Sequence, residues 1–434
     1  MYWVDWVRRL DLSSLIQNGT AIITPRRSWL LVGSLGVALF LNNSDRHAVF
    51  SIFPILKSEL KFTDTQLGLT GSLFLWVYAL CNPISGQIGD RFSKRKLVVV
   101  SLILWSGVTA LTGLSTSPAM LLAFRALLGV TESLFMPNAM ALLAGVHSPR
   151  TLSLAANVFG SGEYAGVAMG GWYGGYMAQE FHWRLVFFSL GIFGILYAIP
   201  YSAVIHRAGR EAPVQPGKTK GRLSITVLAK IPTYRFLCAT FPICVCVVWL
   251  QYTWLPTFLY EKFSLSLAEA GFTATVYLQS ANLVGSLSGA ALADWLYSRT
   301  KASRLWVSCT GFFLAAPCLY LIGNCDSLLV TKAAAVAFGL CGSLFVANLA
   351  ISAFDVVPPE MHASAYGCLN LTGSLISGFA SLLEGRWKAS VGIQNMMSYA
   401  ALACLAAGVL LILSIRFYFQ QDYRQAQSVV DRGL

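Results

Sequence analysis

The sequence predicts an all-α membrane protein whose twelve transmembrane helices form two pseudo-symmetric six-helix bundles. The 434 residues are 56% hydrophobic and 12% charged, with a mean hydropathy of +0.62, whereas soluble domains carry about 25% charged residues. Apolar stretches long enough to cross a hydrocarbon core of about 30 Å occur as six, a basic polar segment, and six more. A charged turn after the second stretch recurs after the eighth, as two homologous halves would predict.

The predicted spans alternate with short polar turns. They lie near residues 28–50, 65–85, 97–116, 118–145, 152–178, 185–205, 236–259, 268–292, 304–323, 327–353, 364–383 and 393–416. The halves are therefore 28–205 and 236–416, joined by a basic linker at 206–235. Residues 1–27 are expected to form an amphipathic segment on the membrane surface, and residues 417–434 a tail.

The basic residues lie mainly on one side of the membrane. When the loops are assigned alternately to the two sides, 22 of the 31 Lys and Arg fall on the same side, which the positive-inside rule makes cytoplasmic. The net charge of +12 thus reflects membrane topology, and we expect a lipid bilayer rather than nucleic acid as the partner. An even number of spans places both termini in the cytoplasm.

Signals for chemistry are missing from the sequence. The ten cysteines lie almost all within apolar runs and lack the spacing of metal ligands. No nucleotide-binding loop or nucleophile constellation occurs. We therefore expect no enzyme, no metal and no cofactor, with a proton as the coupling ion.

A dense basic turn, Gly86-Gln-Ile-Gly-Asp90-Arg91-Phe-Ser-Lys-Arg95-Lys, separates the second and third spans. Its four cations in six residues are stable only in the water between two spans. The weaker copy contains Asp294, 204 residues after Asp90, and Arg299.

This turn resembles the loop between helices 2 and 3 of the major facilitator superfamily, although Ser93 stands where that family usually has a second glycine. In the family, the aspartate bonds groups across the gap between helices 2 and 11 and holds the outward-facing state. The resemblance thus implies a gating role for Gly86, Asp90, Arg91 and Arg95, and for their counterparts in the second half. The simpler interpretation is a positive-inside anchor.

The first and the fourth predicted spans each carry a pair of oppositely charged residues. In the first, Asp45 and Arg46 lie within an apolar context, where an ionised group costs at least about 2.5–3.5 kcal/mol. They must face a cavity or a partner, unless they lie at the outer mouth among headgroups. In the fourth, Arg125 and Glu132 are two turns apart on one face. Protonation of Glu132 would free Arg125 to bind an anion. Alternatively, Arg125 and Glu132 form a static ion pair.

Several motifs together resemble the anion:cation symporter family, which includes sugar-acid importers and the vesicular glutamate and sialic acid carriers. The resemblance covers residues 28–416 and rests on Asp45-Arg46, Trp76-Val-Tyr78, Arg125 with Glu132 and Pro137, His182-Trp183-Arg184, and Trp254-Leu-Pro-Thr-Phe-Leu259.

The resemblance implies roles for single residues. Asp45 and Glu132 would titrate, Arg46 and Tyr78 would hold the substrate's carboxylate and hydroxyls, and Asn370 would contact it from the second half. Spinster lipid transporters share the Asp-Arg pair, the helix 4 arginine and the glutamate, so these residues alone do not separate the two families.

The fifth span carries glycines spaced by four at positions 162, 166, 170 and 174, a ridge that lets another helix approach closely. Glu163 lies beside this ridge, where sugar-acid importers tend to have a neutral amide. It could contact substrate, serve as an additional proton site, or be a packed, hydrogen-bonded glutamate.

The second half offers uncharged hydrogen-bonding groups, among them Gln251, Tyr252, Asn370 and Ser374, which we expect to contribute specificity. The sequence therefore predicts a monomeric, proton-coupled symporter that imports a small organic anion such as a sugar acid by alternating access, in a bacterial inner membrane. The alternative is a Spinster-like, proton-coupled exporter of lysolipids or other amphiphiles.

Overall fold

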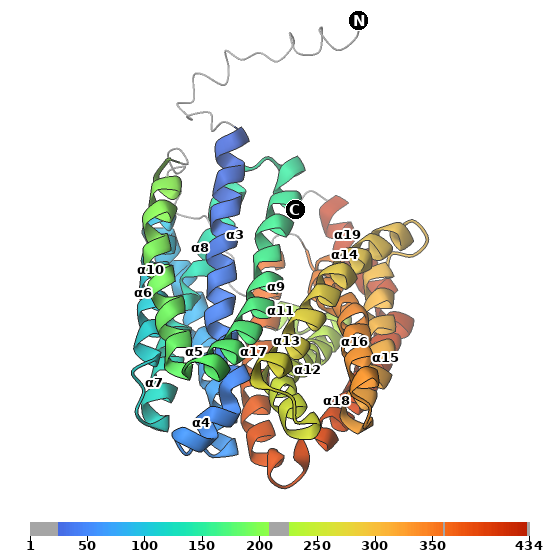
Figure 1. Cartoon of the computed structure of the whole chain (residues 1–434). Helices are drawn as coiled ribbons and strands as arrows, with labels where there is room; N and C mark the ends of the chain where they lie inside the picture. The colour runs from blue at the N-terminus through green and yellow to red at the C-terminus, as the bar shows by residue number, and fades with distance from the viewer. Residues whose placement is uncertain (1–24, 208–224, 359–360, 432–434) are drawn as a thin grey trace, which may run out of the picture.

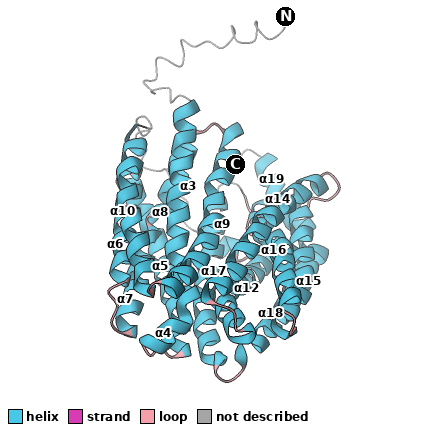
Figure 2. Cartoon of the chain, in the orientation of Figure 1, coloured by secondary structure: helices cyan, strands magenta, loops and turns pink. Residues whose placement is uncertain are grey.

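A computed structural model describes residues 25–207, 225–358 and 361–431. These residues form helices joined by short turns, without a strand among them (Figure 2). The helices form two bundles side by side, one from each half of the sequence (Figure 1).

The first bundle begins with α3, which continues through a 3-10 turn, η1, into α4. Its elements are α3 (Pro25–Ala48), η1 (Val49–Ile52), α4 (Phe53–Glu59), α5 (Asp64–Arg91), α6 (Lys94–Thr112), α7 (Pro118–Ser133), α8 (Phe135–Val146), α9 (Pro149–Glu180) and α10 (Trp183–Arg207).

The second bundle follows a short helix, α11 (Ile225–Leu228). Its elements are α12 (Pro232–Phe263), α13 (Leu267–Phe272), a π-helical turn η2 (Thr273–Tyr277), α14 (Leu278–Tyr297), α15 (Ser303–Asn324), α16 (Leu328–Asn348), η3 (Ile351–Asp355), α17 (His362–Lys388), α18 (Gly392–Ser414), η5 (Ile415–Phe419) and α19 (Gln420–Asp431).

Eight helical stretches of the described chain are long and apolar enough to cross a membrane. Four further stretches complete the predicted twelve: α3 with its extension through α4, α9, α13 with α14, and α17. These four are less apolar because they carry charged residues or glycine and serine, which suit helix-to-helix contact better than contact with lipid. The predicted fold class is confirmed.

Local sequence signals explain where the helices begin. Thr63 precedes α5 and forms a capping box with Gln66, in which each side chain accepts a hydrogen bond from the other residue's backbone N–H. Ser93, the residue that departs from the family loop, is the N-cap of α6, and its Oγ accepts from the Lys96 backbone N–H at 3.5 Å. Serine at this position therefore has a structural reason.

The glycine ridge of α9 allows another helix to approach closely, as predicted, and the structure shows that this helix is α3. A Cβ on Gly162 or Gly166 would overlap the carbonyl oxygens of Gly36 or Phe40, and one on Gly174 would lie 2.6 Å from the Ala48 oxygen. Backbone therefore meets backbone along three turns. Only glycine permits this approach, which fixes α3 and its charged residues against α9.

The two bundles meet where α5 packs against α17. A Cβ on Gly68 would overlap the Ser381 carbonyl oxygen, while Trp76 Nε1 donates to the Leu375 carbonyl at 3.1 Å. These contacts lie toward the end of the molecule that holds the α4–α5 and α17–α18 turns, which we call the far end. The opposite end, which holds the turns at 91–96 and 298–304, is called the basic end; α3 begins and α19 lies at this end (Figure 1).

Some predicted boundaries differ from the structure. The linker was predicted to end at residue 235, but α12 already begins at Pro232, because proline is favoured in the first turn of a helix. The tail at 417–434 continues from α18 through η5 into α19, so it is helical as far as Asp431. The amphipathic segment predicted for 1–27 falls mostly outside the described residues.

Candidate functional site

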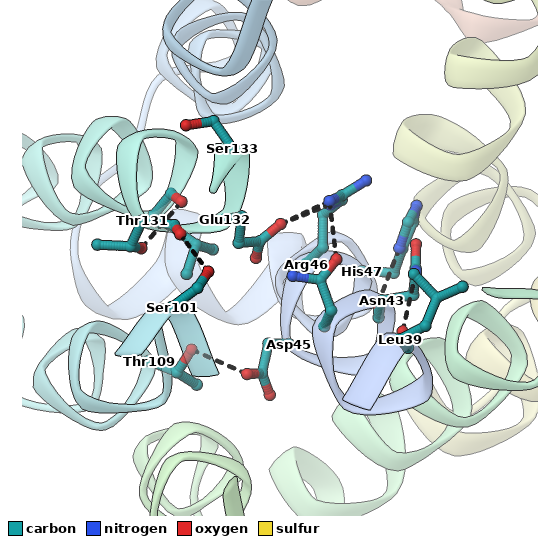
Figure 3. A network of polar contacts seen from close by, with 12 residues as sticks. Leu39, Asn43, Asp45, Arg46, His47, Ser101, Thr109, Thr131, Glu132 and Ser133 are labelled. Carbon is teal, nitrogen blue, oxygen red and sulfur yellow. Dashed lines mark hydrogen bonds and ion pairs between the residues drawn. The ribbon is translucent and has the colours of Figure 1, made fainter. Parts of the chain in front are cut away.

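The charged residues of the first predicted span meet those of the fourth inside the first bundle. Asp45, Arg46 and His47 occupy the last turn of α3, just before the chain tightens into η1. Glu132 comes from α7, whose regular hydrogen bonding is interrupted at Leu134 before α8 begins. Figure 3 shows Arg46 and Glu132 pointing toward one another.

Arg46 and Glu132 form a close ion pair. Arg46 Nη2 lies 2.5 Å and Nε 3.1 Å from Glu132 Oε2, and Nη2 also donates to Asn42 Oδ1 at 2.9 Å. The Glu132 side chain is fully buried, whereas 16% of the Arg46 side chain remains exposed. Burial without a partner would be costly for either charge, so the pair stabilises both. Part of the guanidinium nonetheless stays open to a ligand.

Aromatic rings hold the Arg46 guanidinium in place. Its central carbon lies 4.6 Å from the centre of the Phe74 ring and 5.4 Å from that of Tyr78, both on α5. Cations are attracted to aromatic faces at such distances. Tyr78, predicted to bind substrate, therefore lies beside the predicted arginine.

Asp45 is buried on a different face of α3, about 100° round the helix from Arg46. Its Oδ2 accepts a hydrogen bond from Thr109 of α6 at 3.2 Å, while its buried Oδ1 has no partner among the described residues. The side chains of Asp45 and Arg46 diverge from α3 in Figure 3. A carboxyl group with so few partners suits a neutral, protonated form better than an ionised one.

The predicted pair between Arg125 and Glu132 does not form in this structure. Arg125 instead points to α5, where its Nε donates to the Thr70 carbonyl at 3.3 Å and its guanidinium lies 5.3 Å from the Phe74 ring centre. Arg46 has taken its place at Glu132. Shared position on one face of α7 allowed a pair, but the sequence could not show that α3 brings a second arginine closer.

Glu163 lies on α9 beside Gly162 of the ridge. Its side chain is exposed within the span, and it is close enough to interact electrostatically with Arg46, Tyr78 and Tyr252. No hydrogen bond or ion pair of Glu163 is found in the described part of the chain. This environment argues against the interpretation as a packed, hydrogen-bonded glutamate.

The four predicted residues of the second half do not all reach this site. Tyr252 of α12 does, because its ring contacts His47 with 5.0 Å between ring centres. Gln251 instead points toward α18, where its Nε2 lies 3.0 Å from Met397 Sδ. Asn370 donates to the Tyr366 carbonyl one turn earlier in α17, and Ser374 is half-buried.

Sequence reasoning missed His47. This imidazole is buried, with Nδ1 2.9 Å from the Asn43 carbonyl oxygen and Nε2 without a partner among the residues described. It stacks on Trp249 of α12 at 5.9 Å between ring centres, so it links the first bundle to the second. Its position directly after Asp45 and Arg46 was the available signal.

The two basic turns differ from each other. Gly86, Asp90 and Arg91 lie in the last turns of α5, but the Asp90 side chain falls outside the described set, so its predicted contact stays a prediction. Arg91 is exposed and Arg95 is partly buried.

In the second half, Asp294 lies 3.9 Å from Arg304 of the same bundle, and Arg299 lies over the Trp295 ring at 4.5 Å. Arg304 bonds more closely to Asp355, at 2.6 Å between Nη1 and Oδ1. Neither Arg304 nor Asp355 was predicted, although Arg304 belongs to the same basic turn.

Comparisons with known proteins agree on one family. The model of the Major Facilitator Superfamily matches residues 35–382. The hexuronate transporter of Bacillus subtilis is 25% identical over 316 residues, which cover 70% of this chain and 73% of that protein. A protein of Escherichia coli K12 named "Probable galactarate/D-glucarate transporter" is 24% identical, covering 85% of this chain and 89% of its own length.

Among solved structures, a bacterial homolog to the human lysosomal transporter Spinster, in an inward-facing and occupied conformation, superposes with a TM-score of 0.79. It is 21% identical and covers 92% of this chain and 98% of its own. At this identity the likeness concerns the fold.

Proposed function

Because the chain belongs to the major facilitator superfamily, and is a multi-pass membrane transporter of a small molecule rather than an enzyme, we propose that it imports a small organic anion such as a sugar acid together with protons. The relatives named above support this substrate class.

The observation that carries the proposal is the partly exposed guanidinium of Arg46, held by Glu132. A guanidinium binds a carboxylate through two parallel charge-assisted hydrogen bonds, whereas in this structure Nε and Nη2 of Arg46 both donate to a single oxygen of Glu132, Oε2. When Glu132 takes up a proton, its hold on Arg46 weakens and the substrate carboxylate replaces it. Loss of the proton restores the internal pair and expels the substrate.

Asp45 would be the second proton site. It is buried next to Arg46 in the same helical turn but on a different face, with a single hydrogen bond from Thr109. Ionised, it would be poorly solvated, so its protonation and the occupancy of Arg46 are expected to be coupled through α3. Glu163, exposed and near Arg46, would then contact the substrate's hydroxyl groups.

The charge at the two ends of the molecule supports the proposed orientation in the membrane. Positive charge at the turns 91–96 and 298–304 supports a cytoplasmic basic end, with both termini on that side of a bacterial inner membrane. The bundles pack closely toward the far end, at Gly68 and Ser381. With the bundles in contact at the far end and the basic end in the cytoplasm, we expect the substrate to leave into the cytoplasm from this state.

Uptake by proteoliposomes tests the coupling. Asp45→Asn and Glu132→Gln should abolish glucuronate uptake driven by a pH gradient while leaving exchange of internal for external glucuronate measurable. Glu269→Gln, which alters an exposed glutamate paired with Lys332 at 3.2 Å, serves as the control and should transport normally. Undiminished gradient-driven uptake in both variants would overturn proton coupling.

The rival function is export of a lysolipid. It is suggested by the resemblance to Spinster lipid transporters, which share the residues that correspond to Asp45-Arg46, Arg125 and Glu132. A lysolipid needs an apolar path, whereas the groups around Arg46 are charged or aromatic. Tight lysolipid binding that is insensitive to Arg46→Lys, without glucuronate binding, would favour the exporter.

A further inference from the structure

A cavity lies in the second bundle, away from Arg46. It has a volume of about 480 Å³ and is bounded by α12, α17 and α18. Ligand pockets in proteins commonly have volumes of about 300–1,000 Å³. Its walls are almost entirely apolar, formed by residues such as Pro242, Leu250, Ala380 and Met396.

The cavity opens on the face of α17 that is turned away from the first bundle. Trp76 bonds to Leu375, and Gly68 lies against Ser381 and Gly385, which marks the face of α17 that contacts α5. The lining residues Ile376, Leu383 and Trp387 lie on the opposite face and are 48%, 40% and 44% exposed. In a membrane-spanning helix an exposed apolar face contacts lipid, so the cavity is reached from the bilayer.

One acidic side chain interrupts this apolar lining. Glu384 is 9% exposed, and its Oε2 is buried without a hydrogen-bond partner among the described residues. The Trp254 indole lies beside it, but its Nε1 also lacks a hydrogen bond of acceptable geometry. In its ionised form a buried carboxylate without a cation or donor is costly, so an ammonium group bound here would stabilise the charged form of Glu384.

The protein does not supply that cation itself. Lys388 is one turn from Glu384 on α17, but its Nζ lies 2.6 Å from Glu261 and 3.5 Å from Asp64. Trp387 and Tyr399 line the opening of the cavity, and aromatic faces attract ammonium groups. An acid, two aromatic rings and an apolar interior together match an ammonium group on a hydrocarbon chain.

We propose that this cavity binds an amphiphilic amine from the bilayer, with the ammonium group on Glu384 and the hydrocarbon chain between α12, α17 and α18. The site is independent of the proposed anion transport, because it shares no residue with the cluster around Arg46.

Binding of radiolabelled dodecylamine to the full-length protein in phosphatidylcholine nanodiscs tests this proposal, with empty nanodiscs as background. Unlabelled dodecylamine should displace the label, and dodecanol, which has the same chain without the charge, should compete at least about tenfold more weakly. Glu384→Gln should weaken binding by about tenfold or more, because it keeps the size of the side chain and removes its charge.

Two more variants complete the design. Ala380→Leu fills the cavity without touching the carboxyl group and should also weaken binding, whereas Glu269→Gln should bind as the unaltered protein does. Equal competition by dodecanol would mean that the cavity is only a groove for lipid chains. Three results would each overturn the proposal: equal competition by dodecanol, unchanged binding by Glu384→Gln, or no saturable binding at all. The comparison of the amine with the alcohol uses the unaltered protein, so it does not depend on whether a variant folds.

Discussion

Lys388 Nζ on α17 lies 3.5 Å from Asp64 Oδ1 on α5, so an ion pair joins the two bundles at the far end. Each of these two residues also forms an ion pair within its own bundle: Lys57 lies 2.9 Å from Asp64, and Glu261 lies 2.6 Å from Lys388. A chain of four alternating charges therefore crosses the interface. The Lys388 side chain is only 8% exposed, which makes this pair stronger than most surface pairs.

Asp64→Asn should loosen the far end. Losing an ion pair of about 0.5–1 kcal/mol would raise the population open at that end by roughly 2–5-fold. Distances between spin labels at Lys61 and Ser390, exposed residues of the two far-end turns, should report the opening. Glu269→Gln breaks an ion pair within the second bundle and should leave these distances unchanged. If Asp64→Asn and Lys388→Gln both leave them unchanged, the charges do not hold the interface.

Arg46→Lys should lose most of the affinity for glucuronate although it keeps the positive charge. An ammonium cannot reproduce two parallel hydrogen bonds to a carboxylate, so we expect at least about tenfold weaker binding by calorimetry. Tyr78→Phe removes one hydroxyl and should cost less, about 0.5–1.5 kcal/mol. Equal binding of glucuronate and its uncharged amide would contradict the role given to Arg46.

Glu163→Gln distinguishes the roles left open for this residue. The side chain is exposed near Arg46 and lacks a hydrogen bond in the described structure. If its ionised carboxylate accepts hydrogen bonds from sugar hydroxyls, the amide should weaken glucuronate binding several-fold while leaving proton-driven uptake in place. Unchanged or tighter binding would show that Glu163 is neutral in the loaded protein or does not contact the substrate.

Gly166→Ala should destabilise the protein strongly. The new methyl group would overlap the Phe40 carbonyl oxygen and force α3 away from α9, and overpacking of this kind costs about 1–3 kcal/mol. Gly160→Ala, on the same helix, is the matched control because a Cβ there meets nothing within 4 Å. It should be neutral or slightly stabilising, since alanine favours helix. Thermal unfolding in detergent would compare the two, and equal melting temperatures would contradict the close contact.

The sequence predicted the fold class and the α9 ridge because both depend on patterns local to one helix. Apolar length defines spans, and glycines four residues apart define a face. The sequence singled out Asp45, Arg46 and Glu132, which the structure brings together, but it missed His47 and did not predict which arginine pairs with Glu132. Which arginine meets Glu132 depends on how α3, α5 and α7 pack, and Arg125 and Arg46 carry the same charge.

Long-range packing also explains the misplaced residues of the second half. Gln251 and Tyr252 are neighbours on α12, yet a rotation of about 100° per residue sends one toward Met397 and the other toward His47. Hydrogen-bonding capacity could be listed from the sequence, but the direction of each side chain could not. His47 was overlooked because its position after Asp45 and Arg46 does not show that Trp249 of α12 lies beside it.

The close packing of Gly68 against Gly385 has a counterpart at the basic end. Gly86 lies eighteen residues after Gly68 on α5, and Gly367 eighteen residues before Gly385 on α17, five full turns in each helix, so all four glycines share the contact faces of this antiparallel pair. A Cβ at Gly86 or Gly367 would meet nothing within 4 Å, whereas at Gly68 or Gly385 it would collide with backbone.

The two helices thus have two possible contact points, one at Gly68 and Gly385 and one at Gly86 and Gly367. Only the first is in contact in this structure. We expect α17 to contact α5 at Gly86 when the two bundles separate at the far end. Gly86→Leu should then leave the melting temperature of the present state unchanged and yet stop turnover, while Gly107→Leu on α6, where a Cβ also meets nothing within 4 Å, should change neither the melting temperature nor turnover. Normal turnover in Gly86→Leu would show that the second crossing point is never occupied.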